Sequence, residues 1–324
     1  MIVDLHSHYF PLDAMRGMAD FPVEATEGPD GTVRLSLGGQ AMTLPAQLFS
    51  LEMQLADLHR QQLARRALQP PPFTILHELP PDQGVAWSRR MNDGIAAAAR
   101  SHPEAFIGFA TVPLQDIAAA VVELERAITD LGLRGVEILT SINGVGLDTP
   151  ALDPFWAAAE RLDVPILIHP HYVAGAERMD GYYLRNLIGN PTETAIAGAR
   201  LLFSGVLERF PRLRIILSHG GGSLPHISGR LRHGYAVRPE ARERARDPLG
   251  HLSRLFYDSI VFDPLILRHL VEVVGASQVV LGTDYPFDMG EETPVAFVQD
   301  SGLAAPDRDA ILNAADRMLP GGSL

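Results

Sequence analysis

The stretch Val164-Pro165-Ile166-Leu167-Ile168-His169 is a continuous apolar run that ends in a histidine. Short apolar runs without polar alternation are typical of strands that are buried on both faces, as in a parallel sheet. Comparable runs recur at residues 2–6, 106–112, 135–139, 213–218, 255–258 and 279–284. The recurrence predicts a parallel β-sheet in which each run is one strand.

Segments with helical spacing separate these runs, and we expect helices at residues 82–101, 114–131, 152–162, 191–210, 264–274 and 306–319. Asp153-Pro154 and Asp263-Pro264 are typical helix starts, because a carboxylate can cap the first turn and proline is tolerated there. The alternation predicts an α/β fold, a (β/α)8 TIM barrel that forms a single domain over residues 1–324. A doubly wound open sheet is the alternative, but no Gly-x-Gly-x-x-Gly motif follows the first run, which disfavours a dinucleotide site.

Residues 12–46 interrupt the alternation. They contain the turn sequence Gly28-Pro29-Asp30-Gly31 and two strand-like runs, residues 33–37 and 40–44, joined by Gly38-Gly39. This pattern predicts a small β-hairpin inserted after the first strand. We expect the insertion to lie over one mouth of the barrel, as a lid.

The composition excludes several kinds of chemistry. The chain of 324 residues has no cysteine, and all 27 basic residues are arginines. Without lysine there can be no Schiff base, no P-loop lysine and no lysine carbamate that bridges two metals. Without cysteine there can be no thiolate nucleophile, disulfide or cysteine-ligated zinc. Nucleophiles and metal ligands must therefore come from His, Asp, Glu, Ser, Thr or Tyr.

The net charge of -12 argues against nucleic acid or an anionic membrane as a partner, because both favour clustered positive charge. The apolar runs are shorter than the ~20 residues that a membrane helix needs. The first run begins at Ile2, which leaves no room for a signal peptide. We therefore expect a soluble cytoplasmic protein.

Asp4-Leu5-His6-Ser7-His8 is the most specific local motif. Alternate residues of a strand point to the same side, so His6 and His8 can reach one ion. Neutral imidazoles at this spacing suit Zn2+ or a similar divalent metal. For this pair taken alone, a hydrogen-bonded pair of core histidines explains the motif equally well.

Three other strand ends carry similar groups, namely His169, His219 and Asp284. The carboxyl ends of barrel strands meet at one face, where the active sites of such barrels lie. Four histidines and a carboxylate at these positions predict one joint site rather than five separate packing residues.

Four motifs resemble the decarboxylase branch of the amidohydrolase superfamily: His6-Ser7-His8, His169-Pro170, Ser218-His219-Gly220-Gly221-Gly222 and Leu281-Gly282-Thr283-Asp284-Tyr285-Pro286-Phe287. The resemblance covers almost the whole chain and is strongest over residues 152–287. It implies a barrel, a homodimer and one divalent metal, with zinc expected and manganese as the alternative. The residues that match the family's metal ligands are His6, His8, His169 and Asp284, and His219 matches its general acid/base.

The resemblance also bears on substrate contacts. Arg230 matches an arginine that reaches the neighbouring subunit's site and holds a substrate carboxylate. His171 is a pocket donor, an alternate metal ligand or a loop residue. Where relatives carry a second carboxylate-binding arginine on the hairpin, an ungapped alignment places Met42. Either Arg34 replaces that contact, or the substrate has fewer carboxylates.

The resemblance implies a metal-dependent, non-oxidative decarboxylase of a small unsaturated or aromatic carboxylic acid. His219 would protonate the carbon, directly or through metal-bound water, before CO2 leaves, and Asp284 would orient that water or His219. A hydrolase or hydratase that uses the metal-bound water as nucleophile is the alternative. A third possibility is a catalytically silent binding protein.

Several other residues carry local expectations. Trp87 and Trp156 are expected to pack in the core, and Arg60, Arg65 and Arg66 to form a solvated helix end. Asp258 and Asp263 either support the site or cap helices, with the cap favoured for Asp263. Gly220-Gly221-Gly222 is either a tight turn or a source of N–H groups for an anion.

Overall fold

The computed structural model describes residues 1–16, 21, 23–28 and 31–319. Eight parallel strands form one sheet in the order β1-β5-β6-β7-β10-β11-β12-β13. The strands are β1 (Val3–Asp4), β5 (Arg65–Leu68), β6 (Phe106–Ala110), β7 (Gly135–Leu139), β10 (Pro165–His169), β11 (Arg214–Leu217), β12 (Phe256–Asp258) and β13 (Val279–Val280). The predicted parallel sheet is confirmed, and each predicted run contains a strand.

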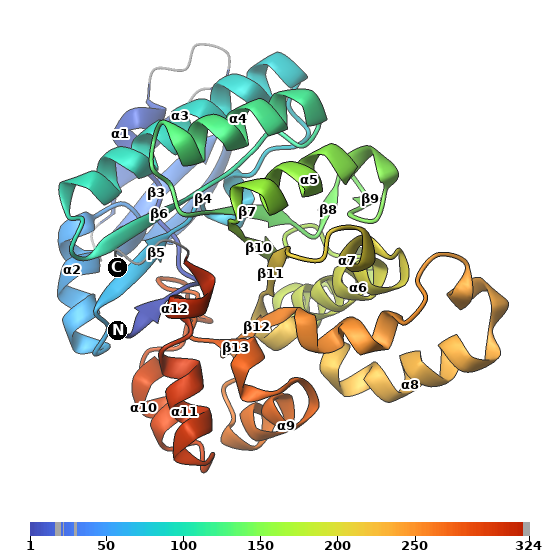
Figure 1. The fold of residues 1–324 in the computed structure, drawn as a ribbon. Coiled ribbons are helices and arrows are strands. Elements are labelled where there is room, and N and C mark those ends of the chain that lie inside the picture. The colour runs from blue at the N-terminus through green and yellow to red at the C-terminus, as the bar shows by residue number, and fades with distance from the viewer. Residues whose placement is uncertain (17–20, 22, 29–30, 320–324) are drawn as a thin grey trace.

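Backbone hydrogen bonds join the first and last strands of this sheet. Leu5 N donates to Leu281 O at 2.9 Å, Thr283 N to His6 O at 3.0 Å, and His8 N to Tyr285 O at 2.7 Å. The sheet is therefore curled, with its two edges in contact (Figure 1). This arrangement is consistent with the predicted (β/α)8 barrel.

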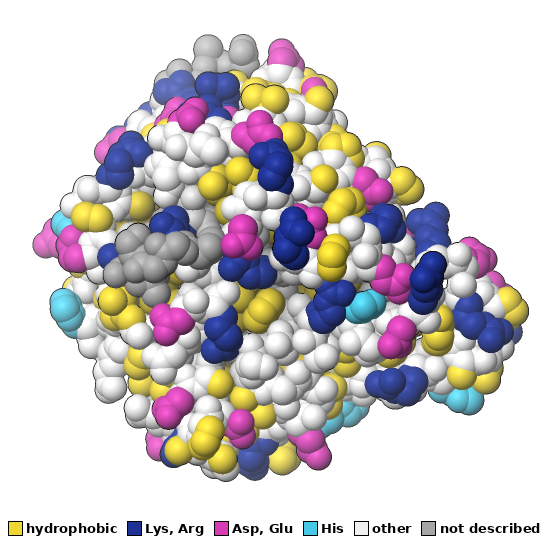
Figure 2. Space-filling view, viewed as in Figure 1, with side chains coloured by type: hydrophobic (Ala, Val, Ile, Leu, Met, Phe, Trp, Pro, Cys, Tyr) yellow, Lys and Arg dark blue, Asp and Glu magenta, His cyan; other side chains and the backbone are white. Residues whose placement is uncertain are grey.

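Helices pack around the outside of the curled sheet (Figure 1). They are α1 (Leu12–Met15), α2 (Leu51–Arg60), α3 (Pro81–Ser101), α4 (Ile117–Thr129), α5 (Asp153–Leu162), α6 (Asn190–Phe203), α7 (Val206–Arg209), α8 (Leu224–Val237), α9 (Pro264–Val274), α10 (Pro294–Gln299), α11 (Ala305–Leu312) and α12 (Ala315–Met318). No described helix is long and apolar enough to cross a membrane. On the face shown in Figure 2, basic and acidic side chains are interspersed.

Two of the predicted helices are interrupted. The helix predicted over residues 191–210 is divided into α6 and α7 at Gly205, which has φ +72°. The helix predicted over residues 306–319 is divided into α11 and α12. Asp263 caps α9 as expected, because its side chain accepts from Leu265 N at 2.7 Å. Asp153 is the first residue of α5 rather than its cap.

The insertion after β1 is a three-stranded antiparallel sheet: β2 (Val23–Glu27), β3 (Thr32–Leu37) and β4 (Gln40–Pro45). It thus has one strand more than the predicted hairpin. Gly38 and Gly39 make the β3–β4 turn with φ +54° and +85°, a conformation that favours glycine. Pro29 and Asp30 of the predicted turn lie outside the described residues. A separate short hairpin, β8 (Ser141–Ile142) with β9 (Val145–Gly146), follows β7.

Two apolar clusters form the core. One lies between sheet and helices and includes Trp87 and Trp156, both buried as expected. The other combines residues of six strands or their ends with the segment around α12: Val3, Leu5, Ala67, Ile107, Phe109, Leu167, Ile216, Val280, Ala314, Ala315, Met318 and Leu319. Apolar packing on both sides explains why the strands read as continuous apolar runs.

Arg66 lies on β5 and is fully buried, so the expectation of a solvated helix end was wrong for this residue. Its Nε donates to Asp4 Oδ2 at 3.2 Å, its Nη1 to Gln54 at 3.2 Å, and its Nη2 to Gln61. The guanidinium also lies 3.8 Å from the centre of the Tyr285 ring. Burial of a charge is tolerated when it is paired and hydrogen-bonded in this way.

Replacing Arg66 with Met should lower the free energy of unfolding by about 3 to 5 kcal/mol, because Asp4 would be left as an unpaired buried carboxyl group. Urea unfolding measures the loss. Arg65→Met is the matched control on the same strand, where Arg65 is half-buried and its Nε donates to Glu104 O. Equal losses in the two variants would contradict a special role for the buried ion pair.

His77 provides a test of pH dependence. It is 2% exposed, and burial lowers its pKa from 6.5 to about 4, with the Ser141 backbone opposing the shift only in part. Since the unfolded chain binds this proton more readily, the stability that neutral His77 contributes is present above pH 6.5 and is lost as the pH falls toward 4. The loss should amount to roughly 3 kcal/mol at about 1.4 kcal/mol per pKa unit.

The measurement is the free energy of unfolding across that pH range. In His77→Gln the curve should be flatter than in the wild type, because no buried imidazole remains to be protonated. His59→Gln changes an exposed histidine of α2 and serves as the control. If all three proteins lose stability in parallel, His77 is not the group responsible.

Candidate metal centre

The five predicted site residues lie together at the carboxyl ends of the strands. His6 and His8 follow β1, His169 ends β10, His219 follows β11, and Asp284 follows β13. The ring centroids of His6, His8 and His169 are 5.0 to 5.2 Å apart in each pair. The closed sheet therefore brings together residues that are far apart in the sequence.

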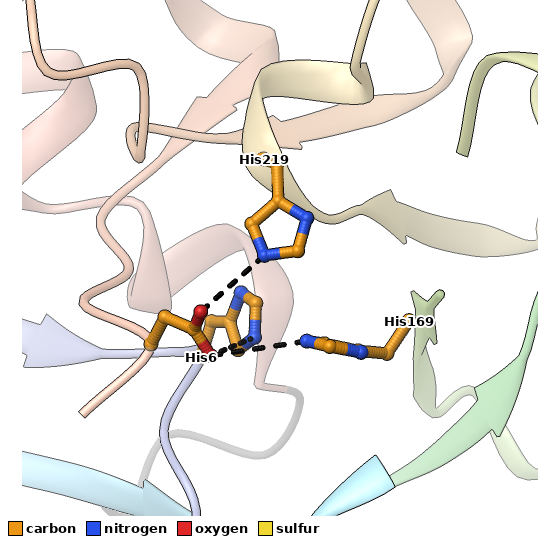
Figure 3. A group of neighbouring side chains, drawn as sticks. His6, His169 and His219 are labelled. Atoms are coloured by element: carbon orange, nitrogen blue, oxygen red, sulfur yellow. Dashed lines mark hydrogen bonds and ion pairs between the residues drawn. The ribbon is translucent and has the colours of Figure 1, made fainter. Parts of the chain in front are cut away.

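The carboxylate of Asp284 lies among these histidines, and the rings of His6, His169 and His219 lie close to one another in Figure 3. Its Oδ1 is 3.0 Å from Nε2 of His8, 3.5 Å from Nε2 of His6 and 3.8 Å from Nε2 of His169. Its Oδ2 is 3.4 Å from Nε2 of His219. Three imidazoles thus face one carboxylate oxygen, and the fourth faces the other.

The Nδ1 atoms of three histidines have oxygen partners on the protein. Nδ1 of His6 is 2.6 Å from Asp258 Oδ2, that of His169 is 2.7 Å from Pro170 O, and that of His8 is 3.2 Å from Pro70 O. An acceptor at Nδ1 favours the tautomer that leaves the Nε2 lone pair free. A neutral imidazole in this tautomer can offer its Nε2 lone pair to a cation at the centre of the group.

A divalent cation fits these donors. The Nε2 atoms of His6 and His169 are buried and have no hydrogen-bond partner among the described residues, which is costly for a polar atom unless something binds it. Donor atoms of His6, His169, His219 and Asp284 all lie within 4.8 Å of one another. Imidazole nitrogens and a carboxylate are the ligands that zinc, manganese and similar ions accept.

The electrostatics of the group follow from its burial. Burial alone would raise the pKa of Asp284, but the four surrounding histidines hold it well below its usual value. Burial lowers the pKa of His8 and lowers that of His169 further. For His6 the carboxylates of Asp258 and Asp284 outweigh burial and raise the pKa to about 10. The site is thus built around an ionised Asp284.

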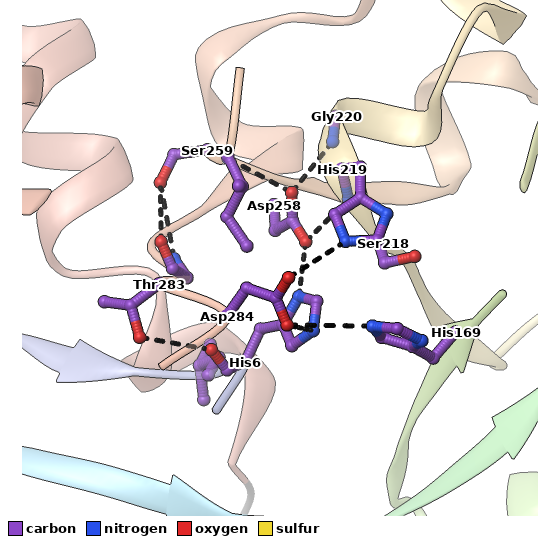
Figure 4. Close-up of polar contacts among 12 residues, drawn as sticks. His6, His169, Ser218, His219, Gly220, Asp258, Ser259, Thr283 and Asp284 are labelled. Atoms are coloured by element: carbon purple, nitrogen blue, oxygen red, sulfur yellow. Dashed lines mark hydrogen bonds and ion pairs between the residues drawn. The ribbon is translucent and has the colours of Figure 1, made fainter. Parts of the chain in front are cut away.

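Asp258 makes polar contacts with residues of the site (Figure 4). Besides holding Nδ1 of His6, its fully buried carboxylate accepts from His219 N at 2.9 Å and Gly220 N at 2.8 Å. One side chain therefore orients both a predicted metal ligand and the predicted acid/base. Of the two roles left open for Asp258, the structure shows support of the site.

The glycines after His219 form a tight turn. Gly220, Gly221 and Gly222 have φ between +60° and +75°, and a Cβ on Gly222 would lie 1.9 Å from Pro191 O. Each backbone N–H from residue 219 to residue 222 donates within the protein, to Asp258, Ser218 or His219. These groups are therefore not free for a substrate anion, and the tight-turn interpretation is confirmed.

Two cavities reach the site. One, of ≈ 650 Å³, is lined by His169 and Asp284 together with Thr32 and Thr43 of the inserted sheet. The other, of ≈ 350 Å³, is lined by His219 and Asp284 and by the apolar residues Ile260, Val261, Phe262 and Ile266, among others. Both cavities therefore extend to Asp284.

Of the two residues predicted to contact substrate, His171 lines a cavity at the site and Arg230 does not. His171 lines the ≈ 650 Å³ cavity close to His169. Arg230 is exposed on α8 and lines neither cavity of this chain. Arg34 is exposed on β3 and pairs with Thr43, so the two side chains share one face of the inserted sheet.

Glu137 was missed. It is fully buried on β7, its Oε2 lies 3.8 Å from Nδ1 of His8, and neither carboxyl oxygen has a hydrogen-bond partner among the described residues. Burial raises its pKa well above the usual value. A charged residue within the apolar run 135–139 was the signal that could have identified it, because such residues are rarely buried without a function.

Comparisons with known proteins agree with this geometry. The amidohydrolase family matches residues 3–320. A 2-amino-3-carboxymuconate-6-semialdehyde decarboxylase from Dictyostelium discoideum is 34% identical over 305 residues, which cover 92% of this chain and 85% of the relative. A gamma-resorcylate decarboxylase from Rhodococcus jostii is 31% identical over 268 residues, which cover 76% and 80%.

A solved structure supports the fold independently. It is a dihydroxybenzoic acid decarboxylase from Polaromonas sp. JS666 with bound manganese and the inhibitor 2-nitroresorcinol. It superposes with a TM-score of 0.80 at 22% identity and covers 97% of this chain and 96% of its own. Since the family match spans nearly the whole chain and the curated relatives are decarboxylases, the chain belongs to the amidohydrolase family, in its decarboxylase branch, and is a carboxy-lyase.

Proposed function

We propose that this enzyme is a metal-dependent, non-oxidative decarboxylase of a small unsaturated or aromatic carboxylic acid. The observation that carries the proposal is the arrangement of four histidines around Asp284. The Nε2 atoms of three imidazoles face its Oδ1, and Nε2 of His219 faces its Oδ2. His6, His8, His169 and Asp284 would hold one divalent ion, zinc or the manganese seen in the Polaromonas enzyme. Such an ion supplies Lewis acidity toward a substrate oxygen.

We infer that His219 delivers the proton. Its Nδ1 has no hydrogen-bond partner among the described residues, and its backbone N–H is held by Asp258. The proton adds to the carbon that bears the carboxylate, the bond from that carbon to the carboxylate breaks, and its electron pair restores the unsaturated system as CO2 leaves. His219 then recovers a proton from solvent.

The test is a panel of aromatic and dienoic acids incubated with enzyme loaded with zinc or manganese. Release of CO2 with a proton in place of the carboxylate supports the proposal. The runner-up, a hydrolase or hydratase, adds water to its substrate. Incorporation of label from isotopic water without CO2 release would therefore favour the runner-up.

We also propose that the enzyme is a homodimer in which Arg230 of one subunit contacts substrate in the other. Arg230 is exposed on α8. Three exposed apolar side chains line the ≈ 350 Å³ cavity, namely Leu187, Phe262 and Ile266. A second copy would cover such a surface more favourably than water would.

Replacing His219 with Asn should lower kcat by a factor of about 10² to 10⁴, the usual contribution of a positioned acid/base, while leaving metal content unchanged. His6→Asn is the contrasting variant, which should lose metal because Nε2 of His6 is one of the proposed ligands. Activity and metal content are measured on the same preparations. Loss of metal from the His219→Asn protein would reassign His219 to the ligand set.

Replacing Asp258 with Asn should weaken metal binding by about 10- to 100-fold, because the carboxylate that orients Nδ1 of His6 is lost. Metal affinity is measured by competition with a chelator. Asp263→Asn is the matched control, since Asp263 caps α9 and asparagine caps helices equally well. Equal metal affinity in the two variants would show that Asp258 does not act through His6.

A further inference from the structure

A third cavity, of ≈ 620 Å³, lies beside the substrate route. It is bounded by the inserted sheet on one side, through Leu37 and Met42, and by the loop after β10 on the other, through His171 and Tyr172. Phe73 and His171 line both this cavity and the ≈ 650 Å³ cavity that reaches Asp284. The two spaces are therefore neighbours, and we call the third one the side cavity.

The walls of the side cavity are largely apolar and carry one charged side chain. Leu37, Met42, Phe73 and Leu76 supply apolar surface, and Glu78 supplies a carboxylate whose Oε2 accepts from the Tyr172 hydroxyl at 3.0 Å. Burial and the neighbouring Glu78 raise the pKa of Tyr172 to about 12. The Tyr172 hydroxyl is therefore neutral at neutral pH and does not offset the charge of Glu78.

No arginine is among the described residues that line the side cavity or the two cavities at the metal centre. The carboxylates there are Glu78, Asp284 and Asp288. A second anionic group in the side cavity would thus meet Glu78 with no arginine on the described walls of that cavity. Arg185 lines an adjoining cavity that shares His171 and Tyr172, where it pairs with Asp180. Glu78 is exposed, so water screens part of this repulsion, but juxtaposed like charges still disfavour such a ligand.

Building on the proposed function, we propose that the side cavity receives the part of the substrate that lies away from the reacting carbon, and that Glu78 and the apolar walls select a monocarboxylic acid with a neutral, apolar substituent. An acid with a second carboxylate at that position is rejected. Met42 contributes by packing against the substituent, which an apolar wall favours by burying surface.

Binding of two matched probes to the zinc-loaded enzyme tests the proposal without requiring turnover. The probes are 3-propylbenzoate and 3-(2-carboxyethyl)benzoate, which differ in the end of one substituent, with benzoate as the reference. Calorimetry should give a dissociation constant at least 10-fold higher for the dicarboxylate than for the propyl acid. In Glu78→Gln the ratio of the two dissociation constants should fall to about 3-fold or less, whereas the dissociation constant of benzoate stays unchanged.

Two further variants complete the design. Glu243→Gln removes an exposed carboxylate outside all three cavities and should leave this ratio at its wild-type value. Leu76→Trp fills the side cavity and should weaken binding of the propyl acid at least 10-fold with little effect on benzoate.

Several outcomes would overturn the proposal. They are equal binding of the two probes by the wild type, a ratio that Glu78→Gln does not change, and a Leu76→Trp protein that binds the propyl acid normally. If the wild type binds the dicarboxylate tightly and Arg34→Met abolishes that binding, Arg34 recognises the second carboxylate and the proposal is wrong. If benzoate itself does not bind to the zinc-loaded enzyme, the proposed function fails instead.

Discussion

The hydrogen bonds between the ends of β1 and β13 are the interaction on which the rest of the structure depends. They curl a sheet that begins with residue 3 until its first and last strands meet, and they continue past the strands to Tyr285. Without that contact, His6 and His8 would lie at one edge of an open sheet and Asp284 at the other. The metal centre is thus a direct consequence of how the sheet closes.

The closed sheet buries several charged and polar side chains, which is costly unless they are paired and hydrogen-bonded. Asp4, Arg66 and Asp258 supply such pairing. Asp4 accepts from Thr283 Oγ1 and from His6 N while it pairs with Arg66, so one buried ion pair ties β1, β5 and the segment after β13 together. Asp258 does the same for His6 and the turn after β11. These carboxylates fix the positions of the ligands, whereas the ligands themselves face one another.

Much of this arrangement could be predicted because it is encoded locally. The strand at 135–139 and the helix at 264–274 match the structure to the residue, since each is an apolar segment with clear boundary signals. The site could be located because strand ends of a barrel converge. Local patterns were wrong for Arg66, because its ion-pair partner Asp4 is distant in the sequence. They left two roles open for Asp258, because the histidine that it contacts is 252 positions away.

The absence of lysine has a structural counterpart in how the chain uses arginine. A buried lysine could not replace Arg66, because the planar guanidinium serves Asp4, Gln54 and Gln61 at once, whereas an ammonium group is a point charge. Arg66 is thus committed to the frame, and no arginine is among the described residues that line the side cavity or the two cavities at the metal centre. In the proposed enzyme, the fixed positive charges near a substrate are then the metal ion and Arg230 of the other subunit. The reacting carboxylate would therefore be oriented by the metal and His219, and selectivity among acids would be determined by the groups that repel a second negative charge.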